Sequence, residues 1–168
     1  ARGGQGVVYR ALSASGAPVA IKLLLDPARE ARKRFAQEAR VLARLGHPNL
    51  LRVYEYGEHE GTPFLVMEYV QGQDLKAFVG AHGTPPLEWT ARVIATVGHT
   101  LEHCHSQGVI HRDVKPANVL IEQATGRPVL VDFGLVKRDP HQLHLQSLDQ
   151  VSLITQNAAI KGTPDFMA

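Results

Sequence analysis

His-Arg-Asp-Val-Lys-Pro-Ala-Asn at residues 111–118, followed by Asp-Phe-Gly at residues 132–134, is the stretch that decides the fold of this chain. Its polar members are Asp113, Lys115, Asn118 and Asp132. Pro116 disfavours a regular helix between them, so we expect these side chains in an irregular loop. Carboxylate and amide oxygens are ligands for magnesium, and lysines neutralise the charge of phosphates. The stretch therefore predicts chemistry on a phosphate group.

Upstream of this stretch, the pattern is that of a small sheet with one helix. Apolar and β-branched runs separated by turn residues predict strands at 7–12, 18–25, 50–56 and 63–69, the last two joined by a turn over 57–61. A helical period over 27–45 places on one face Phe35, Glu38, Ala39, Leu42 and Leu45. Gly46 and Pro48 are expected to end that helix.

Two charged residues fall in apolar surroundings in this part. Lys22 lies within a predicted strand, and Glu38 lies on the apolar face of the predicted helix. A single lysine in a strand is more often a snorkelling or edge residue, which is the structural alternative. An unpaired carboxylate on an apolar face is unfavourable, however. The two residues together predict a Lys22–Glu38 ion pair.

Beyond Gly72 the pattern becomes mainly helical. Asp74 is expected to cap a short helix at 75–81, and a longer helix is expected at 90–107. The buried stripe predicted for the longer helix consists of Ala91, Ile94, Val97, Leu101 and Cys104. A short strand is predicted at 129–131, and a long surface loop at 138–161.

Glycines at the start of the chain can bring backbone amides close to phosphate oxygens. The segment reads Ala-Arg-Gly-Gly-Gln-Gly-Val-Val at residues 1–8. A glycine cluster alone is more often a turn. A strand rather than a helix is expected after it, which argues against a Rossmann or Walker-type loop.

Composition limits the broad class of the chain. Of 168 residues 44% are hydrophobic and 20% charged, which is typical of a soluble globular protein. The net charge of +2 gives no strong case for nucleic acid or an anionic membrane as the main partner. The single cysteine, Cys104, excludes an internal disulfide and a four-cysteine zinc site, and a reducing cytoplasmic location is expected. No apolar run reaches the length of a membrane span, while an anchor outside this segment stays open.

These motifs together resemble the bacterial-type serine/threonine protein kinases, over the whole chain. The resemblance implies an α+β, bilobal protein kinase-like fold, truncated at both ends. A small antiparallel-sheet N-lobe with one helix would occupy 1–67, a hinge 68–72, and an incomplete, mainly helical C-lobe 73–168. The implied activity is transfer of the γ-phosphoryl group of ATP to Ser/Thr hydroxyls of protein substrates, with Mg²⁺ or Mn²⁺ and with activation-loop autophosphorylation.

The resemblance also implies roles for individual residues, following the general kinase template. Asp113 would be the catalytic base or orient the substrate hydroxyl, and Lys115 would reach the γ-phosphate. Lys22 would contact the α- and β-phosphates while paired with Glu38.

The metal and nucleotide sites follow from the same resemblance. Asn118 and Asp132 would bind magnesium. The nucleotide-binding set would be Gly3, Gly6, Val8, Ala20, Lys22, Glu68, Val70 and Leu120, with Met67 as gatekeeper.

Regulatory residues are expected around the activation segment. Arg112 is typical of kinases that respond to phosphorylation of this segment, because its guanidinium can pair with a phosphate. Thr155 corresponds to the first threonine of a segment that bacterial members autophosphorylate, and a merely solvated hydroxyl is its alternative. Thr163 lies in the Gly-Thr-Pro segment typical of the serine/threonine branch.

Other readings stay open. A nucleotide-binding pseudokinase or scaffold, a small-molecule phosphotransferase, and a fragment inactive in isolation are the alternatives. His99 and His103 have a spacing that can chelate zinc, but ordinary surface or packing roles are favoured. The resemblance implies a structural role for His111, beneath Phe133, and Cys104 is expected to be a small core residue.

Overall fold

The structure is a computed structural model that describes residues 2–3, 6–26, 28–132 and 137–138. Contacts divide the described residues into two compact units. The first contains the residues up to Ala43 together with Arg52–Tyr69, and the second contains Arg44–Leu51 and the residues from Val70 on.

The first unit is built on a five-stranded antiparallel sheet in the order β1-β2-β3-β5-β4. Its strands are β1 (Arg2–Gly3), β2 (Gly6–Leu12), β3 (Pro18–Leu24), β4 (Val53–His59) and β5 (Thr62–Glu68). Strand β3 lies at the centre, where Lys22 is opposite Val8 on one side and Leu65 on the other. The antiparallel sheet of the predicted fold is therefore present.

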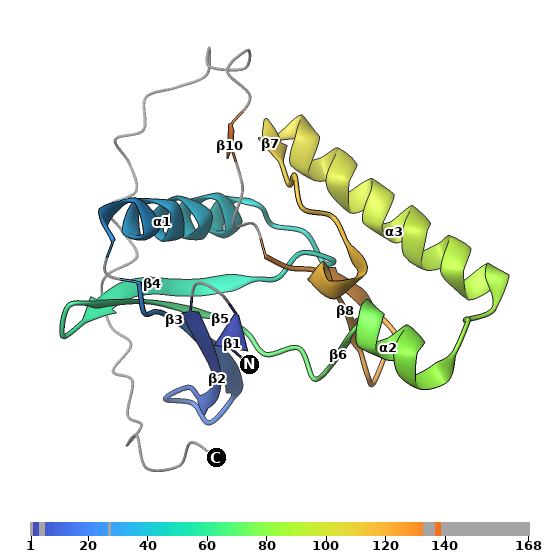
Figure 1. Ribbon diagram of the computed structural model, residues 1–168, viewed down its shortest axis with the longest axis horizontal. Helices are drawn as coiled ribbons and strands as arrows, with labels where there is room; N and C mark the ends of the chain where they lie inside the picture. The colour runs from blue at the N-terminus through green and yellow to red at the C-terminus, as the bar shows by residue number, and fades with distance from the viewer. Residues whose placement is uncertain (1, 4–5, 27, 133–136, 139–168) are drawn as a thin grey trace. The chain divides into compact units, whose positions relative to one another are not determined.

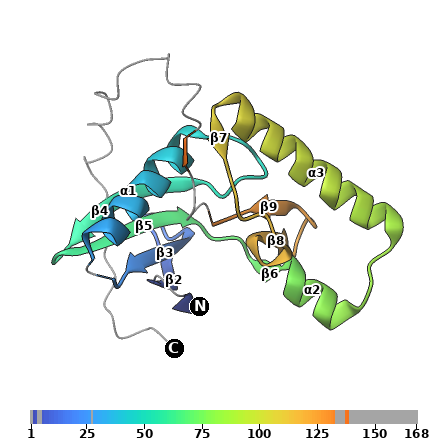
Figure 2. The same ribbon diagram turned by 45° about the horizontal axis from the view of Figure 1, so that its top comes forward.

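Helix α1 (Arg29–Arg44) covers one face of this sheet, as Figures 1 and 2 show. The ring of Phe35 lies 6.0 Å from that of Tyr56 on β4. The predicted helical face is confirmed, because each member is at most 6% exposed: Phe35, Glu38, Ala39, Leu42 and Leu45. Burial of the apolar side chains of α1, such as Phe35 and Leu42, supplies most of the driving force for this layer.

The predicted strand at 50–56 is only partly correct. Strand β4 begins at Val53, whereas Leu50 forms a parallel bridge with Leu130 in the second unit, and the Leu51 amide donates to the Leu130 carbonyl at 3.1 Å. Leu50 and Leu51 are 2% and 8% exposed. Their apolar character thus indicated burial correctly, but they are buried in the second unit and not in the sheet of the first unit, where the predicted strand would have placed them.

The predicted turn over residues 57–61 is also shorter than expected. Strand β4 continues to His59, and the chain reverses at Glu60 and Gly61, which have positive φ angles of 47° and 77°. Strand β4 carries a register shift between Val53 and Glu55. Because β4 runs to His59, its pairing with β5 includes Gly57, which the sequence pattern had placed in the turn.

The second unit combines helices with two small sheets. Its elements are α2 (Leu75–His82), α3 (Leu87–Ser106), a 3₁₀ helix η1 (Pro116–Asn118), and strands β6 (Gly72–Asp74), β7 (Val109–Ile110), β8 (Val119–Glu122), β9 (Pro128–Leu130) and β10 (Lys137–Arg138). One sheet has the order β6-β8-β9, and β7 pairs with β10. The predicted cap is confirmed, because the Asp74 carboxylate accepts a hydrogen bond from the Ala77 amide at 2.8 Å.

Helix α3 begins at Leu87, and its buried face differs from the predicted stripe. The buried residues are Val93, Thr100 and Cys104, whereas Ile94 is 66% exposed and Ala91 is exposed. Thr100 can be buried because its hydroxyl donates to the Thr96 carbonyl at 2.7 Å, so no polar group is left unsatisfied. A prediction based on apolar residues alone does not identify such a threonine as buried.

Two further properties concern the described residues. Cys104 is fully buried, and burial raises the pKa of its thiol to about 11, which confirms the expected small core residue.

No described helix combines the length and the apolar character that a bilayer crossing requires.

Candidate active site

The ion pair between Lys22 and Glu38 is present in the first unit. The Lys22 ammonium lies 3.2 Å from one Glu38 carboxylate oxygen and 3.5 Å from the other. The two side chains are 18% and 7% exposed. The ammonium also lies 5.9 Å from the ring centroid of Phe35. Strand β3 and helix α1 therefore place a largely desolvated charge pair on the helix-covered face of the sheet.

The same face carries three other residues of the predicted nucleotide site. Val8 is directly opposite Lys22, Ala20 lies two residues before it, and Met67 is directly opposite Ala20. Because strand side chains alternate between faces, all four point to one side of the sheet. Ala20 and Met67 are 8% and 6% exposed.

Gly6 and Gly3 pair across the first two strands. A Cβ at Gly6 would overlap the carbonyl oxygen of Leu23, so the close approach of the strands requires glycine at this position.

The remaining predicted nucleotide contacts are a strand end, a residue outside the strands and a residue within a strand. Glu68 ends β5, and its amide donates to the Arg52 carbonyl at 2.8 Å. Val70 begins the second unit's main segment, and Leu120 lies on β8 opposite Val129.

In the second unit, Lys115 and Asn118 converge on Asp113. The Lys115 ammonium lies 2.7 Å from the Asp113 carboxylate. The Asn118 amide nitrogen donates to the same carboxylate at 3.0 Å and to the Asp113 carbonyl at 2.8 Å. The hydrogen bond from Lys115, and after it the one from Asn118, holds the pKa of Asp113 below its ordinary value. The carboxylate is therefore ionised at neutral pH.

Short-range backbone bonds fix Asn118 in this position. Pro116 opens the 3₁₀ turn, and the Asn118 amide donates to the Lys115 carbonyl at 2.9 Å. The Asn118 carbonyl accepts a hydrogen bond from the Val131 amide at 2.9 Å. Asp132 is the next residue along the chain, so this hydrogen bond fixes the backbone directly before it. Asn118 is 5% exposed. The pairing of β8 with β9 thus brings the two predicted metal ligands to one end of the same small sheet.

His111 ties the loop to the same strand. One ring nitrogen, Nε2, lies 3.1 Å from the Val131 carbonyl, and the other, Nδ1, accepts the Asp113 amide at 3.3 Å. These partners place the ring proton on Nε2, and burial lowers the pKa of the imidazole, so the ring is neutral. His111 is 1% exposed. A structural role was predicted, but the bond to Val131 was not, and Phe133 lies outside the described residues.

Two residues of the site have left-handed backbone. Arg112 and Asp132 both have φ of 66°, a conformation that costs an L-residue on the order of 1–2 kcal/mol. Arg112 itself is exposed. Thr155, Thr163 and most of the predicted loop at 138–161 lie outside the described residues.

The chemistry of Asn118 fits a magnesium ligand. Both side-chain hydrogen bonds to Asp113 use Nδ2, which leaves the amide oxygen Oδ1 as an available hard ligand. No cluster of three or more His, Cys, Asp or Glu side chains suited to a metal occurs among the described residues. Magnesium usually keeps water and substrate phosphates as ligands, so one amide and one carboxylate from the protein suit it.

The two histidines whose spacing is compatible with zinc, His99 and His103, have other neighbours. His99 lies 3.5 Å from Glu102, and the ring of His103 lies 5.0 Å from that of His47. The lower pKa of His47 follows from burial and from the neighbouring His103.

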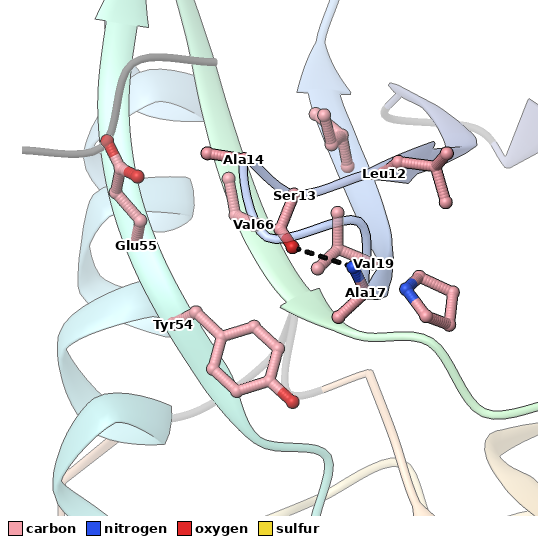
Figure 3. A pocket seen from close by; sticks show the side chains of 10 residues that line it. Leu12, Ser13, Ala14, Ala17, Val19, Tyr54, Glu55 and Val66 are labelled. Atoms are coloured by element: carbon pink, nitrogen blue, oxygen red, sulfur yellow. Dashed lines mark hydrogen bonds between the residues drawn. The ribbon is translucent and has the colours of Figure 1, made fainter. Parts of the chain in front are cut away.

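A separate cavity of about 260 Å³ lies in the first unit (Figure 3). The turn between β2 and β3, Tyr54, Glu55 and Val66 contribute to its wall. None of the predicted site residues lines it, so it is distinct from the groups described above.

Comparisons with known proteins agree with this arrangement. The family model of the protein kinase domain matches residues 1–168. A probable serine/threonine-protein kinase of Corynebacterium efficiens is 36% identical over 160 residues, which cover 91% of this chain and 23% of that protein. PknA of Mycobacterium tuberculosis is 36% identical over 179 residues, which cover the whole of this chain and 38% of that protein.

The fold comparison gives the same family. The crystal structure of the Mycobacterium tuberculosis PknI kinase domain is 32% identical, with a TM-score of 0.69, and the match covers 81% of this chain and 57% of that one. The chain spans about a fifth to two fifths of the curated relatives it matches. The predicted kinase-like α+β fold is confirmed, and the chain belongs to the protein kinase domain family.

Proposed function

We propose that this chain carries the catalytic centre of a serine/threonine protein kinase, which transfers the γ-phosphoryl group of ATP to Ser or Thr hydroxyls of protein substrates. The observation that carries the proposal is the Asp113 carboxylate, held by Lys115 and Asn118 in a chain of the kinase family. Relatives named serine/threonine-protein kinases support the choice of hydroxyl.

In this proposal Asp113 receives the substrate hydroxyl. Its lowered pKa makes it a weak base, so it orients the hydroxyl through a hydrogen bond and accepts the proton late, as the hydroxyl oxygen bonds to phosphorus. Asn118 fixes the carboxylate through its Nδ2, which limits the rotation of the Asp113 side chain.

Lys115 acts as a cation beside the reacting groups. Its ammonium lies 2.7 Å from Asp113, and a flexible lysine in this position can also reach phosphate oxygens. It would neutralise charge that builds up on the transferred group.

Asn118 and Asp132 would hold Mg²⁺ or Mn²⁺, through the Asn118 Oδ1 and the Asp132 carboxylate. The cation supplies neutralisation of phosphate charge when it is bound. The hydrogen bond between the Val131 amide and the Asn118 carbonyl supports this pairing, because it fixes the backbone beside both ligands.

In the other unit, Lys22 would contact the α- and β-phosphates, and Glu38 keeps its ammonium in place. The adenine ring would lie between Val8, Ala20 and Leu120, with Glu68 and Val70 offering backbone groups.

We infer further that the N-lobe spans 1–67, the hinge 68–72 and the C-lobe 73–168. The division of the chain between Tyr69 and Val70 supports this hinge. Arg112, Thr155 and Thr163 are proposed regulatory residues, and a cytoplasmic location is part of the proposal.

The test compares phosphoryl transfer from radiolabelled ATP to a protein substrate by the full-length protein and by Asp113→Asn. The substitution keeps the shape of the side chain but removes its negative charge, so we expect a loss of roughly 10²-fold or more. Nucleotide binding, measured by fluorescent ATP analogue titration, should change little.

Asp74→Asn is the matched control. It makes the same chemical change at the α2 cap, where asparagine caps about as well as aspartate, and should retain nearly full activity. Equal transfer by Asp113→Asn and the unmodified protein would refute the proposal. Nucleotide binding without transfer by the unmodified protein would instead favour a pseudokinase.

A further inference from the structure

Helix α1 carries a concentration of positive charge that the kinase chemistry does not use. Its 16 residues include six basic and two acidic ones, while the whole chain has a net charge of only +2. One of the two acidic residues, Glu38, is buried against Lys22. The solvent side of the helix therefore has six basic side chains and a single carboxylate, that of Glu30.

Four of the basic residues form a stripe along the helix. They are Arg29, Lys33, Arg40 and Arg44, and all four are exposed. At about 100° per residue they fall within an arc of about 60°, on the side opposite the buried face that contains Phe35. We call this set the basic stripe.

The charge of the basic stripe is largely uncompensated. The Lys33 ammonium lies 3.1 Å from the Glu30 carboxylate, but an exposed ion pair of this kind contributes little to stability. No carboxylate of the described residues lies within salt-bridge distance of Arg29, Arg40 or Arg44. Arg32 is different, because it lies off the stripe and binds Glu58 of β4 at 2.7 Å.

We propose that the basic stripe is a docking surface for an acidic segment, rich in Asp and Glu, of a partner protein. Its length follows from helix geometry: fifteen steps at 1.5 Å span about 22 Å. An extended peptide rises about 3.3 Å per residue, so a segment of about seven residues matches the stripe from Arg29 to Arg44. Arginine favours this use, since its planar guanidinium binds carboxylates with two parallel hydrogen bonds.

The composition of the surface favours a peptide over a membrane or a nucleic acid. Helices that lie in a membrane interface present large apolar side chains, and none of the exposed large hydrophobic residues of the described chain belongs to α1. Single-stranded nucleic acids stack their bases on aromatic rings, and the exposed positions of α1 carry none.

The test measures anisotropy of a fluorescein-labelled heptaglutamate peptide at about 50 mM salt. The stripe variant is Arg29→Glu/Arg40→Glu. The matched control is Lys76→Glu/Arg92→Glu, which changes the net charge equally at exposed positions of α2 and α3. We expect at least a tenfold weakening in the stripe variant and less than threefold in the control. Equal weakening in both, or no binding by the unmodified chain, would overturn the proposal.

Two further measurements keep the result specific. The neutral pair Arg29→Gln/Arg40→Gln should weaken binding by an intermediate factor while circular dichroism shows unchanged helix content. A single-stranded oligonucleotide or phosphatidylserine vesicles that bind more tightly than the peptide, at equal anionic charge, would overturn the choice of partner. The readout is independent of phosphoryl transfer, so it succeeds or fails separately from the proposed kinase activity.

Discussion

Replacing Glu38 by glutamine tests how strongly the Lys22–Glu38 ion pair stabilises the first unit. The substitution retains the size of the side chain and one carbonyl acceptor, but removes the negative charge that lies 3.2 Å from the Lys22 ammonium. The partner and the neighbouring core are left in place, so the change isolates the charge.

The expected magnitude follows from the geometry and burial of the pair. A charge-assisted hydrogen bond contributes about 1.5–3 kcal/mol, and the second distance, 3.5 Å, is too long to count as another full bond. Lys22 keeps 18% of its side chain exposed, which moderates the effect. Because the glutamine oxygen still accepts a weaker bond, we expect Glu38→Gln to lower the free energy of unfolding by about 1–2 kcal/mol.

The assay is a double-mutant cycle with Lys22→Met, with each unfolding free energy taken from urea denaturation. The two substitutions should couple by at least about 1 kcal/mol. The control is the Glu30–Lys33 pair, whose side chains are 73% and 59% exposed, and which should couple by less than about 0.5 kcal/mol. The reasoning is refuted if the Lys22–Glu38 coupling does not exceed that of the control pair.

Four other predictions concern the second unit. Lys115→Met should raise the pKa of Asp113 more than Asn118→Leu does, because the hydrogen bond from Lys115 is the larger cause of the lowered pKa. The pKa of the carboxyl is measured by ¹³C NMR titration in each variant, and the reverse order would contradict the prediction. In the unmodified chain, the stabilisation that comes from ionised Asp113 should be complete above the ordinary aspartate pKa and should be lost progressively as the pH falls from there through the lowered pKa, which urea denaturation at a series of pH values measures. Asp74→Ala should cost about 1 kcal/mol by thermal unfolding, and no change would argue against the cap. His111→Leu removes two part-buried hydrogen bonds and should lower the free energy of unfolding by roughly 2–3 kcal/mol, and an unchanged midpoint of urea denaturation would disprove this.

Features governed by local chemistry could be predicted from the sequence. The buried face of α1 follows from its helical period, and the α2 cap follows from the position of Asp74. The Lys22–Glu38 pair was predictable because an acidic residue on an apolar face needs a partner.

Features that depend on distant contacts could not be read in this way. The sequence pattern of Leu50 and Leu51 indicates burial, but only the pairing with Leu130 decides which core receives them. The burial of Thr100 on α3 was missed for a different reason, because the predicted stripe counted only apolar residues although the helix itself satisfies this hydroxyl. The bond of His111 to Val131 joins residues twenty positions apart, and no periodicity reports it.

The left-handed backbone of Arg112 is a source of conformational strain directly beside Asp113. Glycine has no steric penalty at φ of 66°, so Arg112→Gly should relieve a strain on the order of 1 kcal/mol, although it removes the exposed guanidinium. Selection for stability alone would favour glycine at this position. Arg112 therefore holds its exposed side chain at a cost in folding free energy, next to the carboxylate that the proposed reaction uses.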